Sequence, residues 1–570
     1  MRHAAMKPKS SGRNRVRIAA VVLAIAAYCS ATAWVHLNRP TRSATTILAL
    51  RYLLLLPALI GFTRRRNGGA AHVERGEPGI SEVYGTPFLA SVRVQAAVFL
   101  LAAAPLAWYW GRGQTVSDES GYRFQARIFS TGRMAAVGLP MGLDDFRPTV
   151  GNEHPLTGSI SYGSRWFSKY PPGWPAVLAV ADLLGVGWLA SLLLGGGILL
   201  LTGAFAASVF NQKTARLAVL ISIASPYFLY NSMGYLSHPL CGVLIAAAAY
   251  FWLLGMRSQS TWPYWAMFAA LAAAIQVRPF TAFLAGLVLG PVTLWQVRKD
   301  TKRLGRVLVA ATICGACTVG AMSLYDHALT GSYWRSPYAL ARGLDFPIEV
   351  TPSFTVLKQN ALYLNRWSLE ATAVYSFPFL FLLAAWSVVK ESRQRIEVAV
   401  LGLLYAAIVA GYLVQREWST CQYGERYYFE MFFAAAILAA RGLDLLSRDA
   451  RWSARSLSHA SLGLLAVQAC AFAIFTPTML GLTSYSAKVQ EAFKRVTSPR
   501  TVVFLQDPPT IDYINAARNF NPNAADWQNA PAVYLPDPGL ERRDAVTRLL
   551  GRSRWVVFQE SAAPKLKRLD

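Results

Sequence analysis

Apolar blocks of about 20 residues recur along this chain from Ile18 to about Gly481, and a short charged loop closes each one. An α-helix rises about 1.5 Å per residue, so one such block crosses about 30 Å of hydrocarbon. Only 15% of the 570 residues are charged and 54% are hydrophobic, whereas soluble proteins carry about 25% charged residues. The pattern excludes a soluble enzyme and a protein with a single anchor, and it predicts a mainly α-helical, polytopic membrane bundle.

Basic residues outnumber acidic ones by 56 to 30, which gives a net charge of +26. In polytopic proteins Lys and Arg collect in cytoplasmic loops. No RNA-binding motif or basic amphipathic helix stands out, so nucleic acid is not an expected partner. The protein is therefore expected in the cell (inner) membrane, with the basic tail 1–17 and Arg64-Arg65-Arg66 on the cytoplasmic side. The spans predicted below then place the C-terminus on the outer side.

About thirteen spans are expected. They cover residues 18–35, 44–62, 94–110, 187–209, 215–233, 237–256, 263–278, 280–297, 307–325, 371–389, 396–414, 427–446 and 459–481. Residues 174–186 are apolar but too short to cross, so they are expected to form an interfacial or re-entrant helix. The polar stretches 113–172 and 326–370 become outer loops of a membrane domain over 18–482.

The last segment, 483–570, alternates strand and helix patterns and predicts a small extracytoplasmic α/β domain. Strands are expected at TVVFL, AVYL and RWVVFQ, and helices at SAKVQEAFKRV and ERRDAVTRLL. The commoner role for such an appendage is packing or acceptor recruitment without chemistry of its own.

The first outer loop opens with two adjacent acids, Asp118 and Glu119, just after a predicted span. A carboxylate at the membrane face can act as general base toward an acceptor hydroxyl or amine if it stays ionised. Ser117 or Asp118 is also a good N-cap for the following segment, YRFQARIF. On spacing alone capping is the commoner role, and both interpretations stay open.

The same loop ends in a segment with three prolines and a glycine, KYPPGWP, which begins at Lys169. These residues predict a rigid bend where the chain re-enters the membrane. Lys169 then lies at headgroup depth, where its ammonium group can bind a lipid phosphate. Alternatively, the Lys169 side chain only extends along the flanking aromatic rings so that its ammonium group reaches water.

Further polar groups are expected on the same outer face, at His238, at Arg278, in the loop after Tyr325 and in the GERYYFE turn around Arg426. Ionisable groups at membrane depth are costly and are often functional. The sequence has no HExxH, Walker, GxSxG or Rossmann motif, which leaves nucleotide-driven chemistry and serine hydrolysis without support.

Several of these motifs follow one another in a fixed order over roughly residues 94–482. They are Asp-Glu-x-x-Tyr from Asp118, Lys-Tyr-Pro-Pro-Gly from Lys169, Arg-Pro at Arg278, a TGS loop after Tyr325 and Gly-x-Arg-Tyr-Tyr around Arg426. In order, spacing and membrane side the sequence resembles the membrane-embedded GT-C glycosyltransferases. The likeness is to the bacterial relatives of the protein O-mannosyltransferases and of the lipid A aminoarabinose transferase.

The resemblance implies transfer of a single sugar from a polyprenyl-phosphate donor to an acceptor glycan, lipid or protein on the outer face. It implies that Asp118 is the catalytic base and that Glu119 assists or orients it. Lys169, with Arg426 or Arg278, would hold the departing lipid phosphate. No metal and no cofactor beyond the lipid-linked donor is expected. The residues expected to contact substrate are Tyr122, Tyr170, His238 and Tyr427.

One departure from that family and two other functions stay open. Several members place a second acid at the outer end of a later span, where this chain has His238. A transporter or flippase for a lipid-linked glycan is the main alternative, although a transporter should carry polar or helix-breaking positions near the bilayer midplane. A non-catalytic scaffold for envelope assembly is the other.

Overall fold

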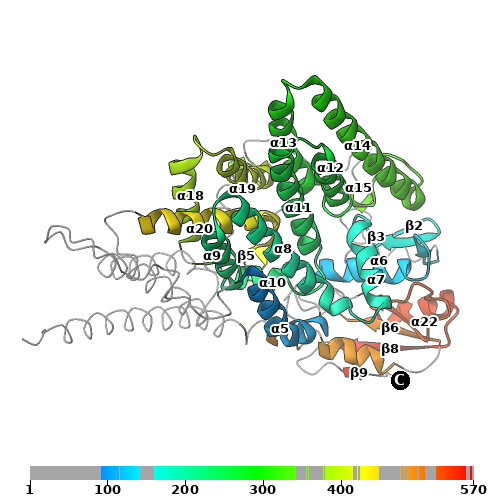
Figure 1. Cartoon of the computed structure of the whole chain (residues 1–570). Helices are drawn as coiled ribbons and strands as arrows, with labels where there is room; N and C mark the ends of the chain where they lie inside the picture. Colours follow the sequence, from blue (N-terminus) through cyan, green and yellow to red (C-terminus); the bar gives the residue numbers. More distant parts are fainter. Residues whose placement is uncertain are drawn as a thin grey trace, which may run out of the picture.

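The computed structural model describes residues 91–113, 116–140, 159–341, 379–414, 424–448, 487–496, 500–506 and 521–559, together with a few shorter stretches. In this part of the chain, long helices form one bundle and a small sheet lies beside one end of it (Figure 1).

Six helices among the described residues are long and apolar enough to cross a membrane. They are α5 (Val92–Gly111), α8 (Gly187–Val209), α11 (His238–Arg257), α13 (Pro279–Val297), α14 (Thr301–Thr330) and α19 (Ile396–Val414). Each coincides with a predicted span, so the chain is a mainly α-helical, multi-pass membrane protein. The tail 1–17 and the spans predicted at 18–35, 44–62 and 459–481 lie wholly or almost wholly outside the described residues, and the count of thirteen stays a prediction.

Four predicted spans are interrupted or shorter in the structure. The helices found there are α9 (Gln212–Ile223) with α10 (Pro226–Asn231), α12 (Trp262–Ile275), α18 (Leu380–Glu391) and α20 (Phe432–Arg448). The continuous span predicted over 215–233 is wrong, because Pro226 has no N–H with which to continue the hydrogen-bond ladder of α9. Pro279 disfavours helical backbone at Arg278, so α12 ends before it.

The other boundaries also have local causes. Phe379 has a left-handed φ of 62° directly before α18. The 3₁₀ helix η3 (Arg426–Met431) precedes α20. Helix α14 runs beyond the predicted span 307–325 and ends at Gly331, whose φ of 79° forms a left-handed cap.

The first outer loop contributes a helix and three short strands to the described part of the chain. These are α6 (Ser117–Phe129), β1 (Ala136–Val137), β2 (Ser159–Tyr162) and β3 (Arg165–Ser168), with strand order β1-β3-β2 and antiparallel pairing. The short helix expected in 174–186 is α7 (Gly173–Leu183). In the second outer loop, the short helix α15 (Pro337–Ala341) follows α14.

The C-terminal segment forms a four-stranded sheet, called the C-terminal sheet below. Its strands are β6 (Thr501–Leu505), β7 (Ala532–Pro536), β8 (Arg554–Gln559) and β9 (Lys565–Lys567), in the order β7-β6-β8-β9, and α22 (Leu540–Leu549) precedes β8. Strand β6 pairs in parallel with β7 and β8, whereas β9 is antiparallel to β8. The first three strands lie where the sequence predicts them.

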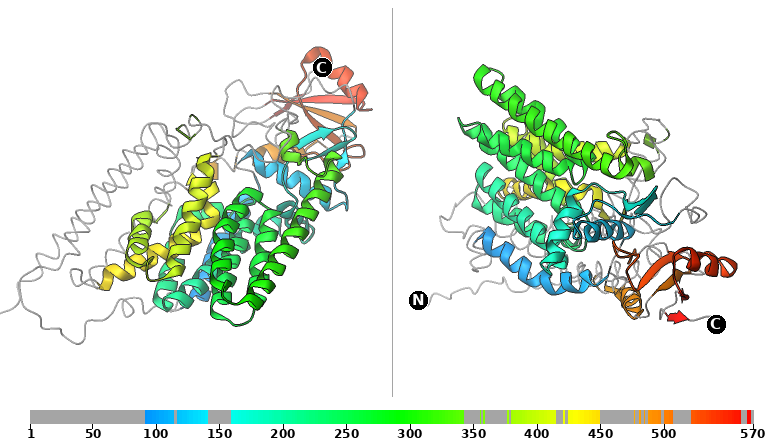
Figure 2. Two further views of the ribbon diagram at one scale, coloured as in Figure 1. Left: turned by 90° about the horizontal axis from the view of Figure 1, so that it is seen from above. Right: turned by 90° about the vertical axis from the view of Figure 1, so that its right-hand side faces the viewer.

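The C-terminal sheet shares a hydrophobic core with the first outer loop. Phe124 and Ile128 of α6 and Trp166 of β3 are fully buried in one cluster with Val502 and Phe504 of β6. Figure 2 shows from two further sides that the sheet, coloured orange to red, lies beside α6 and outside the helix bundle. Helix α6 is therefore fixed by contacts with segments distant in sequence.

Candidate active site

Helix α6 brings Asp118 against Arg426, a cation 308 positions further along the chain. The N-cap of α6 is Val116 and makes no side-chain capping bond, so Asp118 lies in the first turn rather than at the cap. Its Oδ2 lies 2.5 Å from Nη2 of Arg426, which opens η3. The Asp118 side chain is 25% exposed, so the carboxylate is within reach of a ligand.

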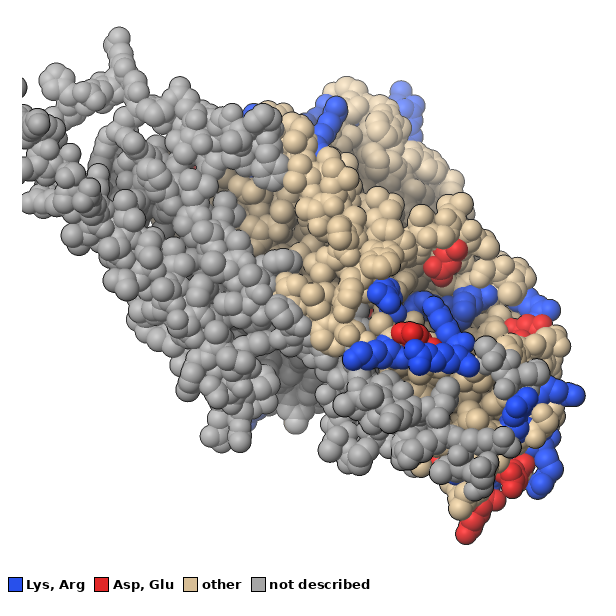
Figure 3. All heavy atoms as spheres, turned by 90° about the horizontal axis from the view of Figure 1, so that it is seen from below, with Lys and Arg blue, Asp and Glu red and all other residues tan. Residues whose placement is uncertain are grey.

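The surroundings of Asp118 favour its ionised form. Burial alone raises the pKa of the Asp118 carboxyl. The charges of Arg426 and Lys169, and a hydrogen bond from the Tyr170 hydroxyl, outweigh burial and lower the pKa below its usual value. Asp118 is therefore a carboxylate at neutral pH. Figure 3 shows Lys and Arg side chains gathered around a few acids on the described part of this face of the molecule.

Glu119 lies next to Asp118 in sequence but has different contacts. Its side chain is only 1% exposed. Its Oε1 accepts a hydrogen bond of 2.9 Å from the N–H of Tyr235. Gly234 has a φ of 78°, and a Cβ there would lie 2.4 Å from Oε1 of Glu119, so only glycine fits beside this carboxylate. Glu119 thus fixes the turn between α10 and α11.

The bend that carries Lys169 is held at several points. The N–H of Gly173 donates to the carbonyl of Gln276 at 2.8 Å, and Nε1 of Trp174 donates to the carbonyl of Tyr235 at 2.6 Å. A Cβ on Gly173 would lie 2.7 Å from that Gln276 oxygen. Nζ of Lys169 lies 5.5 Å from the ring centre of Tyr170. The sequence-predicted rigid bend is thus present, and it holds Lys169 near Asp118.

Two stacked tyrosines, Tyr122 and Tyr170, lie beside Asp118. The rings of Tyr122 and Tyr170 lie 4.2 Å apart, centre to centre. The Tyr122 hydroxyl lies 2.9 Å from Oγ of Ser237. Burial raises the pKa of Tyr122 to about 12, so this hydroxyl keeps its proton at neutral pH. Nη1 of Arg278 donates to the same Ser237 oxygen at 3.5 Å, which connects α6 with the start of α13.

A buried ionic cluster lies at the adjoining ends of α11 and α13. Oε1 of Glu430 lies 2.7 Å from Nε of Arg278 and 2.8 Å from Nδ1 of His238, and the Glu430 side chain is 0% exposed. Tyr427 stacks on Tyr412 at 4.6 Å, and the Arg278 guanidinium lies 5.0 Å from the Tyr427 ring. Uncompensated buried charge is costly, so each member of this cluster depends on the others.

The nine residues predicted as site residues form one continuous region. Asp118, Lys169, Arg426, Tyr122 and Tyr170 make its part around α6. Arg278, His238 and Tyr427 make its part at the bundle, and Glu119 braces the turn beside it. Two further members were not among the predicted site residues: Tyr412, which no motif indicates, and Glu430, which the sequence indicates only as the last residue of the GERYYFE turn. The sequence feature that could have identified Glu430 is an acid within the apolar run FEMFF, because a buried carboxylate needs a cationic partner.

Comparisons with known proteins bear on the fold. No family model matches the chain, and no curated protein matches it significantly. Among solved structures, it is similar to the Archaeoglobus fulgidus oligosaccharyltransferase tethered with an acceptor peptide. The TM-score is 0.51 at 12% identity, over 84% of this chain and 70% of that chain. For ArnT from Cupriavidus metallidurans bound to undecaprenyl phosphate, the TM-score is 0.49 at 15% identity, over 81% of this chain and 93% of that chain.

These structural neighbours are membrane glycosyltransferases of the GT-C type. The likeness to the oligosaccharyltransferase shows that this chain has the GT-C fold, and at 12% identity it shows the fold alone. The resemblance stated from the sequence motifs is thereby confirmed at the level of architecture.

Proposed function

We propose that this chain is a glycosyltransferase that moves a single hexosyl or pentosyl unit from a polyprenyl-phosphate donor to an acceptor on the outer face of the cell membrane. The observation that carries the proposal is the contact between an ionised carboxylate, Asp118, and the cation Arg426, with Lys169 beside both. A carboxylate and two cations side by side suit a reaction in which the carboxylate removes a proton and the cations stabilise a departing phosphate.

The two cations bind and stabilise the leaving group. Negative charge grows on the phosphate as its bond to the anomeric carbon breaks, and fixed cations lower that barrier. Lys169 supplies a point charge on a rigid bend, and Arg426 supplies a planar fork that fits two phosphate oxygens. A donor of this kind arrives already activated and anchored in lipid, which suits a compartment without nucleotide sugars.

Asp118 removes the proton of the acceptor. In the structure its charge is neutralised by Arg426 at 2.5 Å. A donor phosphate competes for the same guanidinium, and Asp118 then loses part of its compensation and becomes a better base. It accepts the proton of the attacking hydroxyl or amine while the new bond to the anomeric carbon forms and the phosphate leaves with the electron pair.

The residues around this pair act as supports. Glu119 fixes the turn at Tyr235, and Glu430 holds Arg278 and His238 in place. The stacked rings of Tyr122 and Tyr170, and of Tyr427 with Tyr412, offer flat faces for a sugar or an isoprenoid chain.

The direct test incubates purified protein with a panel of polyprenyl-phosphate sugars and measures which donor is consumed. We expect one donor to be consumed by the wild type and by a control variant, Glu541→Gln, which changes an acid in α22. Asp118→Asn should abolish consumption, while membrane insertion and thermal stability show that the variant is folded. Full turnover by folded Asp118→Asn protein would remove Asp118 as the base.

A further inference from the structure

A second polar site lies at the opposite end of the helix bundle. A cavity of about 740 Å³ is bounded by the end of α11, the end of α13, the start of α14 and the start of α19. Helix α13 begins beside Arg278 of the candidate active site and ends at this cavity 19 residues later, which corresponds to about 28 Å of helix. The cavity and the candidate active site therefore lie a membrane thickness apart.

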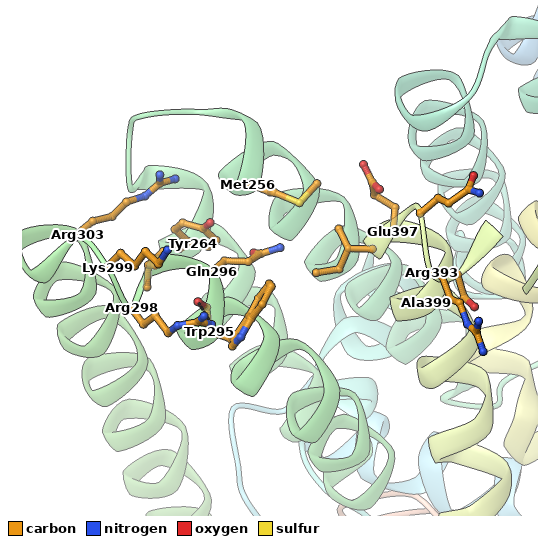
Figure 4. A pocket seen from close by; sticks show the side chains of 14 residues that line it. Met256, Tyr264, Trp295, Gln296, Arg298, Lys299, Arg303, Arg393, Glu397 and Ala399 are labelled. Atoms are coloured by element: carbon orange, nitrogen blue, oxygen red, sulfur yellow. Dashed lines mark hydrogen bonds between the residues drawn. The ribbon is translucent and has the colours of Figure 1, made fainter.

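The cavity has an excess of positive charge. Its charged lining consists of Arg298, Lys299, Arg303, Arg393 and a single acid, Glu397. Figure 4 shows that the first three approach from the α13–α14 side and that Arg393 and Glu397 approach from the other side.

The one carboxylate does not balance these cations. Glu397 already pairs with Arg257 at 3.4 Å. Lys299 and Arg393 make no ion pair with a carboxylate within the described part of the chain. Nη2 of Arg303 donates to the carbonyls of Gly255 and Ser258 at 2.5 Å each, which fixes the wall but adds no negative charge.

Gln296 is an independent sign of a missing ligand. Its amide nitrogen and amide oxygen are both buried, and neither has a hydrogen-bond partner among the described residues. Figure 4 shows this side chain extending from α13 into the space between the two walls. Buried polar groups are nearly always satisfied, so an occupant should accept from Nε2 and donate to Oε1.

The rim of the cavity lies where a membrane surface is expected. Trp295 lines the cavity, is 58% exposed and carries the Arg298 guanidinium 4.5 Å above its ring. Exposed Trp beside Arg and Lys at a helix end is typical of the membrane–water interface. Basic pockets between helices on the cytoplasmic side bind anionic lipid headgroups.

We propose that this cavity binds a phosphate group, attracted by the excess positive charge to which Lys299 and Arg393 contribute from opposite walls and hydrogen-bonded by Gln296. The interfacial position of Trp295 favours the headgroup of an anionic phospholipid as its source over free phosphate. A phosphoglycerol headgroup offers both the acceptor oxygens and the donor hydroxyl that Gln296 lacks. This assignment does not depend on the chemistry at Asp118.

The test uses the full-length protein in phosphatidylcholine nanodiscs, titrated in one arm with phosphatidylglycerol and in the other with inorganic phosphate. The readouts are the thermal midpoint of unfolding and native mass spectrometry of retained lipid. The double variant Lys299→Ala/Arg393→Ala should bind ~30-fold more weakly. The matched control Lys302→Ala/Arg306→Ala also removes two cations, exposed on α14 and outside the cavity lining, and it should bind like wild type.

Gln296→Leu separates a ligand site from a structural role. Replacing an unsatisfied buried amide by an apolar group of similar size should stabilise the protein in pure phosphatidylcholine, yet reduce the response to phosphatidylglycerol about fivefold. A response to inorganic phosphate alone, lost in the double variant, would support the site and assign a soluble source. Equal responses of wild type, double variant and Gln296→Leu in both arms would overturn the proposal.

Discussion

At the residue scale, the central feature is a carboxylate whose partner lies 308 positions away in the sequence. The sequence indicates both Asp118 and Arg426 as site residues, but spacing cannot tell which of several cations meets the acid. Only the tertiary fold, which packs η3 against α11 and α19, decides that Arg426 forms the ion pair with Asp118, while Arg278 pairs with Glu430. The capping role that spacing favours for Ser117 or Asp118 is absent, because the helix already begins at Ser117, with Val116 as its cap.

The pairing has a consequence for pH dependence. Burial raises the pKa of Asp118, and Arg426 and Lys169 together bring it below the usual 3.8. A lowered pKa means that Asp118 stays ionised until the pH falls through that lower value. The variant Arg426→Gln loses the positive charge that lowers the pKa of Asp118, so the pKa of Asp118 rises in this variant. We expect the acid limb of the kcat/KM profile to move to higher pH in this variant.

The matched control for that profile is Arg133→Gln, which removes an exposed cation beyond the end of α6. Its acid limb should coincide with that of the wild type. An acid limb that stays in place in Arg426→Gln would show that Arg426 does not set the ionisation of Asp118.

Lys169 offers a separate prediction. If its ammonium group binds the donor phosphate in the ground state as well as the transition state, Lys169→Ala should raise the KM for the lipid-linked sugar by about tenfold, for a charged contact of 1–2 kcal/mol. Steady-state kinetics with a fixed acceptor measure this. An unchanged KM would favour the alternative in which Lys169 only extends to water beside Tyr170 and Tyr338.

At the element scale, α6 is the connection between the membrane bundle and the C-terminal sheet. Arg127 of α6 donates to the backbone carbonyls of Asn521 and Asn523, and Oγ of Ser120 accepts from the N–H of Asn521 at 2.5 Å. Burial lowers the pKa of Arg127 to about 9, so it stays charged at neutral pH. The C-terminal sheet therefore helps to fix the helix that carries Asp118.

Breaking this connection should weaken catalysis from a distance. Arg127→Leu leaves two buried carbonyls without a donor, at a cost of about 1–3 kcal/mol each. We expect a lower thermal midpoint, faster proteolysis after residue 482 and a reduced kcat. The exposed control Arg133→Leu should change none of these. Wild-type stability and kcat in Arg127→Leu would mean that the sheet does not support α6.

The long apolar helices could be predicted from the sequence, whereas the first and last residues of the shorter helices could not. Helices α8, α11 and α13 lie within two residues of their predicted limits, because each fills an apolar block long enough to cross a membrane. The break at Pro226 and the turn at Phe379 depend on local backbone chemistry inside apolar runs, which a hydropathy pattern does not register. The ion pair between Arg278 and Glu430 depends on tertiary contacts.

At the scale of the whole molecule, polar chemistry is concentrated at the two ends of one bundle. Helices α11, α13 and α19 each run from the candidate active site to the cationic cavity. The basic residues around that cavity lie on the side that the positive-inside rule assigns to the cytoplasm. In the proposed orientation, Asp118 and Lys169 face the outside, where the donor and acceptor are expected to meet.

The most direct measurement is photo-crosslinking of a diazirine-labelled polyprenyl phosphate to the full-length protein, followed by mass spectrometric mapping of the modified peptides. We expect labelling in the Lys169–Gly173 bend and in η3. This labelling should be lost when Lys169→Ala and Arg426→Gln are combined, and it should be kept in Lys302→Ala/Arg306→Ala. Labelling only at other segments, or labelling unaffected by the loss of both cations, would contradict it.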